Sequence, residues 1–138
     1  MKLPGSTPHV KLRRAFAMKP KLQPTQWIAK KPHAMIRHAF RMKLKPGNAA
    51  EYKRRHDEIW PELAKAIREA GISDYSIFFE EATLTLFAVQ KQTPGNTAAD
   101  LPNHPAVKKW WAYMAPLMEV NPDNSPACGE LKRVFHLD

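Results

Sequence analysis

The chain has 138 residues, of which 43% are hydrophobic and 25% charged, a composition typical of a globular protein of one domain. Its 22 Lys and Arg outnumber its 13 Asp and Glu, which gives a formal net charge of +9. The single cysteine, Cys128, excludes an intrachain disulfide and a thiolate zinc cluster, and favours a reducing compartment. The apolar stretches fall far short of the roughly 20 residues that a transmembrane helix needs.

The positive charge is concentrated at the N-terminus. Residues 1–34 contain eight Lys and Arg and no Asp or Glu, so residues 35–138 carry a net charge of only +1. Five prolines interrupt the first segment and leave no helical or strand period in it. We therefore predict that 1–34 is a disordered, basic, proline-rich extension and that the folded domain is 35–138, with Met35 as the natural start. A basic arm that contacts polyanions is the alternative for this segment.

The predicted domain opens with a strand followed by a helix. Apolar and basic side chains alternate in residues 36–45, which is the period of a strand with one apolar face. Pro46 and Gly47 then break the strand. Asn48 and Glu51 match the pattern of a capped helix start.

Apolar and aromatic residues follow at helical spacing on one face: Tyr52, His56, Ile59, Leu63 and Ile67. Pro61 interrupts this run, so we predict a kink and a second helical piece over 61–70 that Pro61 begins. Gly71 is expected to end that piece in the left-handed conformation.

The second half of the domain predicts a hairpin, a helix and a last strand. Residues 75–80 and 84–92 are rich in β-branched, aromatic and large apolar side chains, and only three residues separate them. A loop over 93–105 leads to a helix that begins at Pro105 and presents an apolar stripe at helical spacing. That stripe consists of Val107, Trp110, Trp111, Met114 and Met118. Turn-forming residues 121–126 precede a predicted strand over 130–137.

This order, β-α-β-β-α-β, predicts an α+β, ferredoxin-like fold with an antiparallel sheet and two helices on one face. The predicted strands are apolar on much of both faces, as Ile77 and Phe78 illustrate. Because helices cover only one face, we predict a homodimer packed sheet to sheet. A pocket is expected between sheet and helices or at the dimer rim.

His56 is the main candidate for acid–base chemistry, because an imidazole gives and takes a proton at neutral pH. It follows Tyr52 by one helical turn, and the hydroxyl groups of Tyr52 and Tyr75 are expected in the same pocket. A purely structural histidine is the alternative. Trp110 and Trp111 point about 100° apart on a helix, so one of them is expected in the core and the other at a cavity, where indoles bind sugars. Two core or dimer-contact tryptophans are equally compatible with the spacing.

Other chemistry has no matching pattern in the sequence. The spacing of histidines and carboxylates predicts no metal site, and there is no glycine-rich phosphate loop or G-x-S-x-G motif. His38 and His136 are interpreted as structural. From the residues alone, we therefore predict a small acid–base pocket lined by aromatic and hydroxyl groups, with no cofactor.

Three stretches resemble the L-rhamnose mutarotase family: MIRHAFRMKLKPGNAAEYKRRHDEIWPEL (35–63), NHPAVKKWWAYM (103–114) and NPDNSPACGELKRVFHL (121–137). The resemblance implies a dimeric α/β-barrel of ferredoxin-like subunits. It also implies a cytoplasmic isomerase that interconverts the α and β anomers of L-rhamnose without a cofactor. The catalytic acid of that family matches His56, and its sugar-binding residues match Tyr52, Tyr75, Trp110 and Trp111.

Two other functions remain as alternatives at this point. One is a cofactor-free monooxygenase-like enzyme of the same dimeric α/β-barrel architecture. The other is a nucleic-acid-binding ferredoxin-like module, which the near-neutral charge of 35–138 disfavours. No membrane partner is expected.

Overall fold

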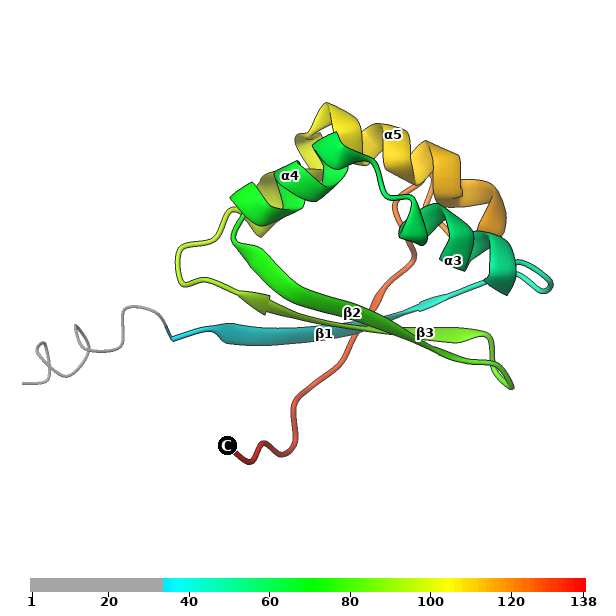
Figure 1. Ribbon diagram of the computed structural model, residues 1–138. Helices are drawn as coiled ribbons and strands as arrows, with labels where there is room; N and C mark the ends of the chain where they lie inside the picture. The colour runs from blue at the N-terminus through cyan, green and yellow to red at the C-terminus, as the bar shows by residue number, and fades with distance from the viewer. Residues whose placement is uncertain (1–33) are drawn as a thin grey trace, which may run out of the picture. The chain divides into compact units, whose positions relative to one another are not determined.

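The computed structural model describes residues 34–138 (Figure 1). The predicted extension, 1–34, lies outside the described residues except for Ala34. The chain divides after Ala34 into two units, and the second, Met35–Asp138, contains every helix and strand described below.

Four antiparallel strands form one sheet in the order β2-β3-β1-β4. Their bounds are β1 (Ile36–Lys43), β2 (Ile72–Glu80), β3 (Thr85–Gln92) and β4 (Gly129–Glu130). The central strands β1 and β3 pair along their whole length, and β2 and β3 form the predicted hairpin. The order of elements is the predicted β-α-β-β-α-β, so the α+β, ferredoxin-like prediction is confirmed.

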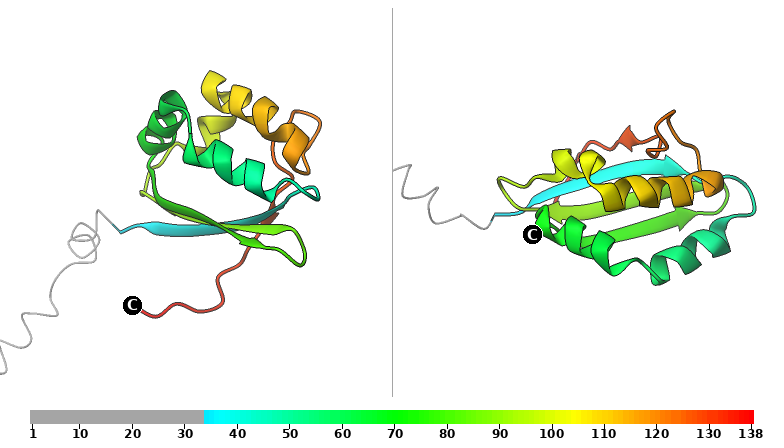
Figure 2. Two further views of the ribbon diagram at one scale, coloured as in Figure 1. Left: turned by 45° about the vertical axis from the view of Figure 1, so that its right-hand side comes forward. Right: turned by 90° about the horizontal axis from the view of Figure 1, so that it is seen from above.

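The three α-helices lie on one face of the sheet (Figures 1 and 2). They are α3 (Ala49–Asp57), α4 (Pro61–Glu69) and α5 (Pro105–Met114), and the short 3-10 turns η2 (Ala98–Asn103) and η3 (Ala115–Leu117) flank α5. The predicted break between α3 and α4 is present, and a proline occupies the first turn of both α4 and α5. A proline is tolerated there because the first backbone N–H groups of a helix have no partner within the helix.

The hydrophobic core fills the space between the helices and the sheet. Alternate side chains of β3, and of β1 with the residue that follows it, point to the helices and are at most 5% exposed: Met42, Leu44, Leu86 and Ala88. Leu63 of α4 and Val107, Trp110 and Met114 of α5 meet them from the other side. The two periods recognised in the sequence, two in the strands and about 3.6 in the helices, therefore meet in one core.

Gly71 ends the α4 segment in the predicted left-handed conformation, with φ of 94°. A Cβ atom at this position would lie 2.4 Å from the Thr93 hydroxyl oxygen. The close approach is fixed by a hydrogen bond of 2.9 Å that Thr93 N donates to the Gly71 carbonyl. Glycine is thus required here both by conformation and by space.

The predicted capping pair is wrong. The Asn48 backbone, with φ of −108° and ψ of 5°, is not in the extended conformation from which an N-cap side chain reaches the first helical amides. Its side-chain amide instead donates to the Lys45 carbonyl at 3.3 Å. Glu51 binds the guanidinium groups of Arg54 and Arg55, each at 2.7 Å.

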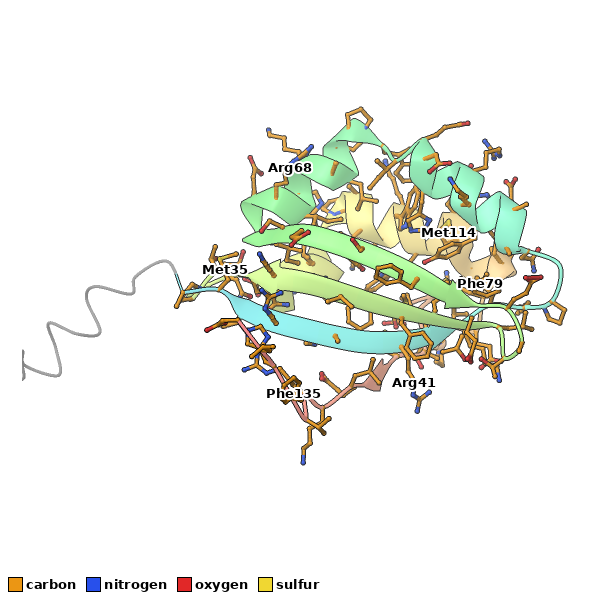
Figure 3. All side chains as sticks on the ribbon, turned by 60° about the horizontal axis from the view of Figure 1, so that its bottom comes forward. Met35, Arg41, Arg68, Phe79, Met114 and Phe135 are labelled. Atoms are coloured by element: carbon orange, nitrogen blue, oxygen red, sulfur yellow. The ribbon has the colours of Figure 1, made fainter. Side chains whose placement is uncertain are left out.

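The predicted last strand over 130–137 is also wrong in its length, because β4 contains only Gly129 and Glu130. Leu131 N still donates to the Ala39 carbonyl at 3.2 Å, but no later residue pairs with any strand of the described chain. The segment leaves the sheet on the side away from the helices (Figures 1 and 3). Its apolar side chains are consequently exposed, with 90% for Val134, 76% for Phe135 and 78% for Leu137.

Candidate functional site

A cavity of about 1320 Å³ lies between the helical layer and the sheet. Its walls come from all three α-helices and from the helix-facing side of β1, β2 and β3. All five residues that the sequence nominated line it: Tyr52, His56, Tyr75, Trp110 and Trp111. The structure thus brings together side chains from two helices and one strand that are up to 59 positions apart in the sequence.

His56 lies in the last turn of α3 and is fixed by Tyr52, one turn earlier. The two rings are stacked, with 4.2 Å between their centroids. His56 Nδ1 is 3.0 Å from the Tyr52 carbonyl oxygen. A carbonyl oxygen only accepts hydrogen bonds, so Nδ1 carries the proton and Nε2 of the neutral ring has the free lone pair.

Burial lowers the pKa of His56 below its reference value of 6.5, because an imidazolium loses hydration in this site. The hydrogen bond to the Tyr52 carbonyl and the negative charge of Asp57 act in the opposite direction on this pKa. The neutral ring therefore predominates at neutral pH, and the protonated ring is a stronger acid than a histidine in water.

The two tyrosines of the site remain protonated at physiological pH. Burial raises the pKa of Tyr52 well above its usual value of 10. Tyr75 is 38% exposed, and loss of hydration at its hydroxyl group raises its pKa to about 12. Tyr52 of α3 and Tyr75 of β2 both line the cavity. Both residues can therefore donate hydrogen bonds to a ligand.

Trp110 and Trp111 occupy the two different positions that their 100° separation predicts. Trp110 is 8% exposed and belongs to the core, where its ring meets the His56 ring edge-on at 5.2 Å between centroids. Trp111 is half-buried and packs against the outside of the core. Both indoles line the cavity, so neither is purely a core residue.

A second group of residues, which local sequence patterns did not predict, holds α3 against α5. The Trp60 ring meets the Trp110 ring edge-on at 5.0 Å and stacks on Tyr113 at 5.4 Å. The Arg55 guanidinium lies 4.0 Å from the centre of the Tyr113 ring and donates a hydrogen bond to the Tyr113 carbonyl. Contacts between residues so far apart in sequence leave no local pattern to recognise.

Glu51 completes this second group by binding Arg55 along α3 at 2.7 Å. Hydrogen bonds from Arg54 and Arg55 lower the pKa of Glu51 to about 2. The carboxylate is therefore charged at physiological pH and orients Arg55 towards α5.

A polar group on the sheet was also missed. Gln90 and Gln92 occupy helix-facing positions of β3, in line with Leu86 and Ala88, and both line the cavity together with His38 of β1. The sequence does contain a sign of this group, because the helix-facing positions of β3 change from apolar residues to two glutamines. His38, interpreted from the sequence as structural, therefore has a place at the cavity wall.

Two further observations concern the described residues 34–138 alone. No three His, Cys, Asp or Glu side chains among them are grouped as a metal ion would need. None of their helices has the length and apolar character to cross a membrane.

Comparison with known proteins adds independent information. The sequence model of the L-rhamnose mutarotase family matches residues 37–137. An L-rhamnose mutarotase from Brucella anthropi is 57% identical over 97 residues, which cover 70% of this chain and 92% of that protein. An L-rhamnose mutarotase from Sinorhizobium fredii is 58% identical over 97 residues, which cover 70% of this chain and 93% of that protein.

A comparison with solved structures points to the same family. The crystal structure of L-rhamnose mutarotase from Formosa agariphila matches with a TM-score of 0.70 and 50% identity, over 75% of this chain and 99% of that one. A conserved protein from Methanosarcina mazei, 11% identical with a TM-score of 0.52, shares the fold alone. The chain described here belongs to the L-rhamnose mutarotase family.

Proposed function

We propose that this protein is an isomerase that interconverts the α and β anomers of L-rhamnose. The observation that carries the proposal is the position of His56, stacked on Tyr52 and edge-on to Trp110 at the wall of one cavity, in a chain of this family. An acid–base group among hydroxyl donors and indoles suits an uncharged, polyhydroxylated ligand.

The reaction consists of proton transfers around one C–O bond. A proton is delivered to the ring oxygen, the anomeric hydroxyl loses its proton, and the bond between the anomeric carbon and the ring oxygen breaks to give the open aldehyde. Rotation of the aldehyde and closure on its other face, with the proton transfers reversed, give the other anomer. Because this reaction proceeds unaided in water, general acid–base assistance of about 10²–10⁴-fold is a sufficient contribution, and neither a metal nor an organic cofactor is required.

We assign the residues as follows. The imidazolium form of His56 donates its Nε2 proton to the ring oxygen, while Nδ1 stays hydrogen-bonded to the Tyr52 carbonyl. Tyr52 and Tyr75 hold sugar hydroxyls, and Trp110 and Trp111 pack against the sugar. The apolar wall formed by Phe40 and Met42 is suited to the C6 methyl group of the sugar.

The alternatives of a monooxygenase-like enzyme and a nucleic-acid-binding module have less support. Membership of the mutarotase family favours the isomerase over both. The net charge of +1 over residues 35–138 is a second argument against nucleic acid as a partner.

We also propose that the protein forms a homodimer through the face of the sheet that the helices do not cover. Phe78 of β2 is 62% exposed on that face, beside its register partner Phe87 of β3. The C-terminal segment, which carries exposed apolar side chains, leaves the sheet on the same side. A second copy would remove both sets from water. A cytoplasmic location is proposed as well, on the single cysteine.

Saturation-transfer NMR on L-rhamnose tests the proposed reaction directly. The full chain should increase the rate of magnetisation transfer between the two anomeric protons in proportion to enzyme concentration. Anomer exchange at the rate of the buffer alone would contradict the proposal. Oxygen uptake with flat aromatic substrates, measured in parallel, would instead favour the monooxygenase alternative.

A further inference from the structure

We propose that Gln90 and His38 bind hydroxyl groups of the sugar and set the selectivity of the site. With Tyr75 they form a line of side chains across the floor of the cavity, which we call the polar row (Tyr75, Gln90 and His38). This inference rests on the proposed function and extends it from the reacting end of the sugar to its other hydroxyls.

The register of the sheet places the three side chains next to one another. His38 of β1 is the direct partner of Gln90 of β3. On the other side of β3, Ser76 pairs with Val89 and Ser73 pairs with Lys91, so the irregularity that contains Tyr75 lies beside Gln90. All three members of the polar row line the cavity.

Gln90 is the buried polar side chain of the described core, with only 4% of its surface exposed. Gln92 Nε2 donates to Gln90 Oε1 at 2.6 Å, which occupies one end of the Gln90 amide. The other end makes no hydrogen bond to any residue from 34 to 138, and it is not sealed from the cavity. A buried amide with one free end is unfavourable unless a ligand or water completes it. The free end of Gln90 is therefore available to a sugar hydroxyl.

His38 adds a second polar group to the floor. Its Nδ1 accepts from Gln92 Nε2 and its Nε2 faces Glu130 Oε1, both at 3.4 Å. These contacts are longer than ordinary hydrogen bonds, so exchanging one of them for a closer hydroxyl group costs little. The Phe40 ring lies beside the imidazole, with 5.3 Å between the two ring centroids.

The polar row continues from the proposed catalytic group. His56 stacks on Tyr52, and both line the same cavity as Tyr75, the first member of the row. We therefore place the other hydroxyls of a sugar whose ring oxygen meets His56 over Gln90 and His38, which line the same cavity. A site that hydrogen-bonds a hydroxyl rejects analogues that lack it, because its own polar groups are then left unpaired.

The test compares Gln90→Leu and His38→Gln with the wild-type chain in the NMR exchange assay. The substrates are L-rhamnose and its derivatives deoxygenated singly at C2, C3 or C4. We expect Gln90→Leu to lower kcat/KM for L-rhamnose about tenfold, mainly through KM, as the loss of one hydrogen bond implies. For the derivative that lacks the contacted hydroxyl, the variant and the wild type should be equally efficient. The matched controls, Thr85→Val on β3 outside the cavity and His136→Gln near the C-terminus, should match the wild type throughout.

Two outcomes overturn the inference. One is wild-type KM and wild-type discrimination among the deoxy sugars in both variants, at unchanged thermal stability. The other is an equal loss of efficiency on every sugar, which would mean a structural role. Gln90→Leu keeps the side-chain volume, so its melting temperature should not fall. If the wild-type chain does not accelerate exchange at all, it is the proposed function that fails, and tryptophan fluorescence titration with the same sugars still tests binding to the polar row.

Discussion

His56 donates its Nδ1 proton to the backbone carbonyl of Tyr52 while its ring lies stacked on the Tyr52 phenol. The same residue thus fixes the tautomer and the plane of the imidazole. Because residues four apart on a helix are neighbours, this arrangement requires only that α3 form. The arrangement gives the two imidazole nitrogens different roles, because Nδ1 is hydrogen-bonded to the carbonyl and Nε2 remains available for proton transfer.

Replacing His56 should remove most of the acceleration without unfolding the protein. We expect His56→Ala and His56→Gln to reduce the rate of anomer exchange by about 10²–10⁴-fold, the usual contribution of a positioned acid–base group. Saturation-transfer NMR on L-rhamnose measures this rate. His136→Ala, which alters an exposed histidine near the C-terminus, should retain the wild-type rate. Undiminished exchange in His56→Ala would mean that another group transfers the proton.

The lowered pKa of His56 also makes stability depend on pH. In the unfolded chain this pKa returns to about 6.5, so between the folded and unfolded values the unfolded chain binds more protons. The free energy of unfolding should therefore fall as pH drops below about 6.5 and become level below the folded value, as far as His56 contributes. Urea unfolding of wild type and His56→Gln at several pH values isolates this contribution. Parallel curves for the two proteins over that window would contradict the assigned shift.

The two neighbouring tryptophans should differ in their effect on stability. Trp110→Ala leaves a cavity in the core and should lower the free energy of unfolding by about 3–5 kcal/mol. Trp111→Ala removes a half-buried ring and should cost clearly less, while weakening sugar binding. Urea unfolding measures the free energy of unfolding of both variants, and the KM of anomer exchange reports on sugar binding. Equal destabilisation by both substitutions would be inconsistent with their different burial.

Gly71 and Gly47 offer a matched pair for the backbone. Both have positive φ, 94° and 81°, but only at Gly71 would a Cβ atom meet other atoms, the nearest at 2.4 Å. Gly47→Ala should cost about 1–2 kcal/mol for the left-handed conformation alone. Gly71→Ala should cost more, since Thr93 must also move. Thermal or urea unfolding of the two variants provides the comparison, and a smaller loss for Gly71→Ala would show that the contact with Thr93 is readily relieved.

The proposed dimer makes a prediction about mass. Light scattering after size exclusion should give about twice the 15.8 kDa of one chain for the wild type. Phe78→Lys places a charge in the proposed interface and should give a mass near 15.8 kDa. Glu69→Lys, on the exposed surface of α4, should leave the dimer intact. A monomeric wild type at micromolar concentration would refute this assembly.

Local sequence patterns predicted the helices and the relative positions of the site side chains on each helix. Tyr52 and His56, or Trp110 and Trp111, share a helix, so their relation follows from 3.6 residues per turn alone. The breaks at Pro61 and Gly71 were predictable for the same reason, because a missing N–H or a positive φ acts on the backbone where it stands.

Features that depend on distant partners were not predictable in this way. The contact of Trp60 with Tyr113 and the line from Tyr75 through Gln90 to His38 join segments whose register only the folded sheet defines. The predicted length of the last strand was wrong for a related reason. Alternation in 130–137 gives the propensity to be extended, but a strand also needs a neighbour, and residues 34–138 supply one only as far as Leu131.

The break before Pro61 has a consequence for proton transfer. It ends α3 at Asp57, one residue after His56, and the His56 carbonyl already accepts a hydrogen bond from Ile59 N instead of from a residue of a continuing helix. The imidazole therefore stands where the aligned peptide dipoles of α3 present their negative end, which favours a positive charge on the ring. In an uninterrupted helix the same histidine would lie at mid-length, without that field to stabilise the imidazolium that the buried site disfavours.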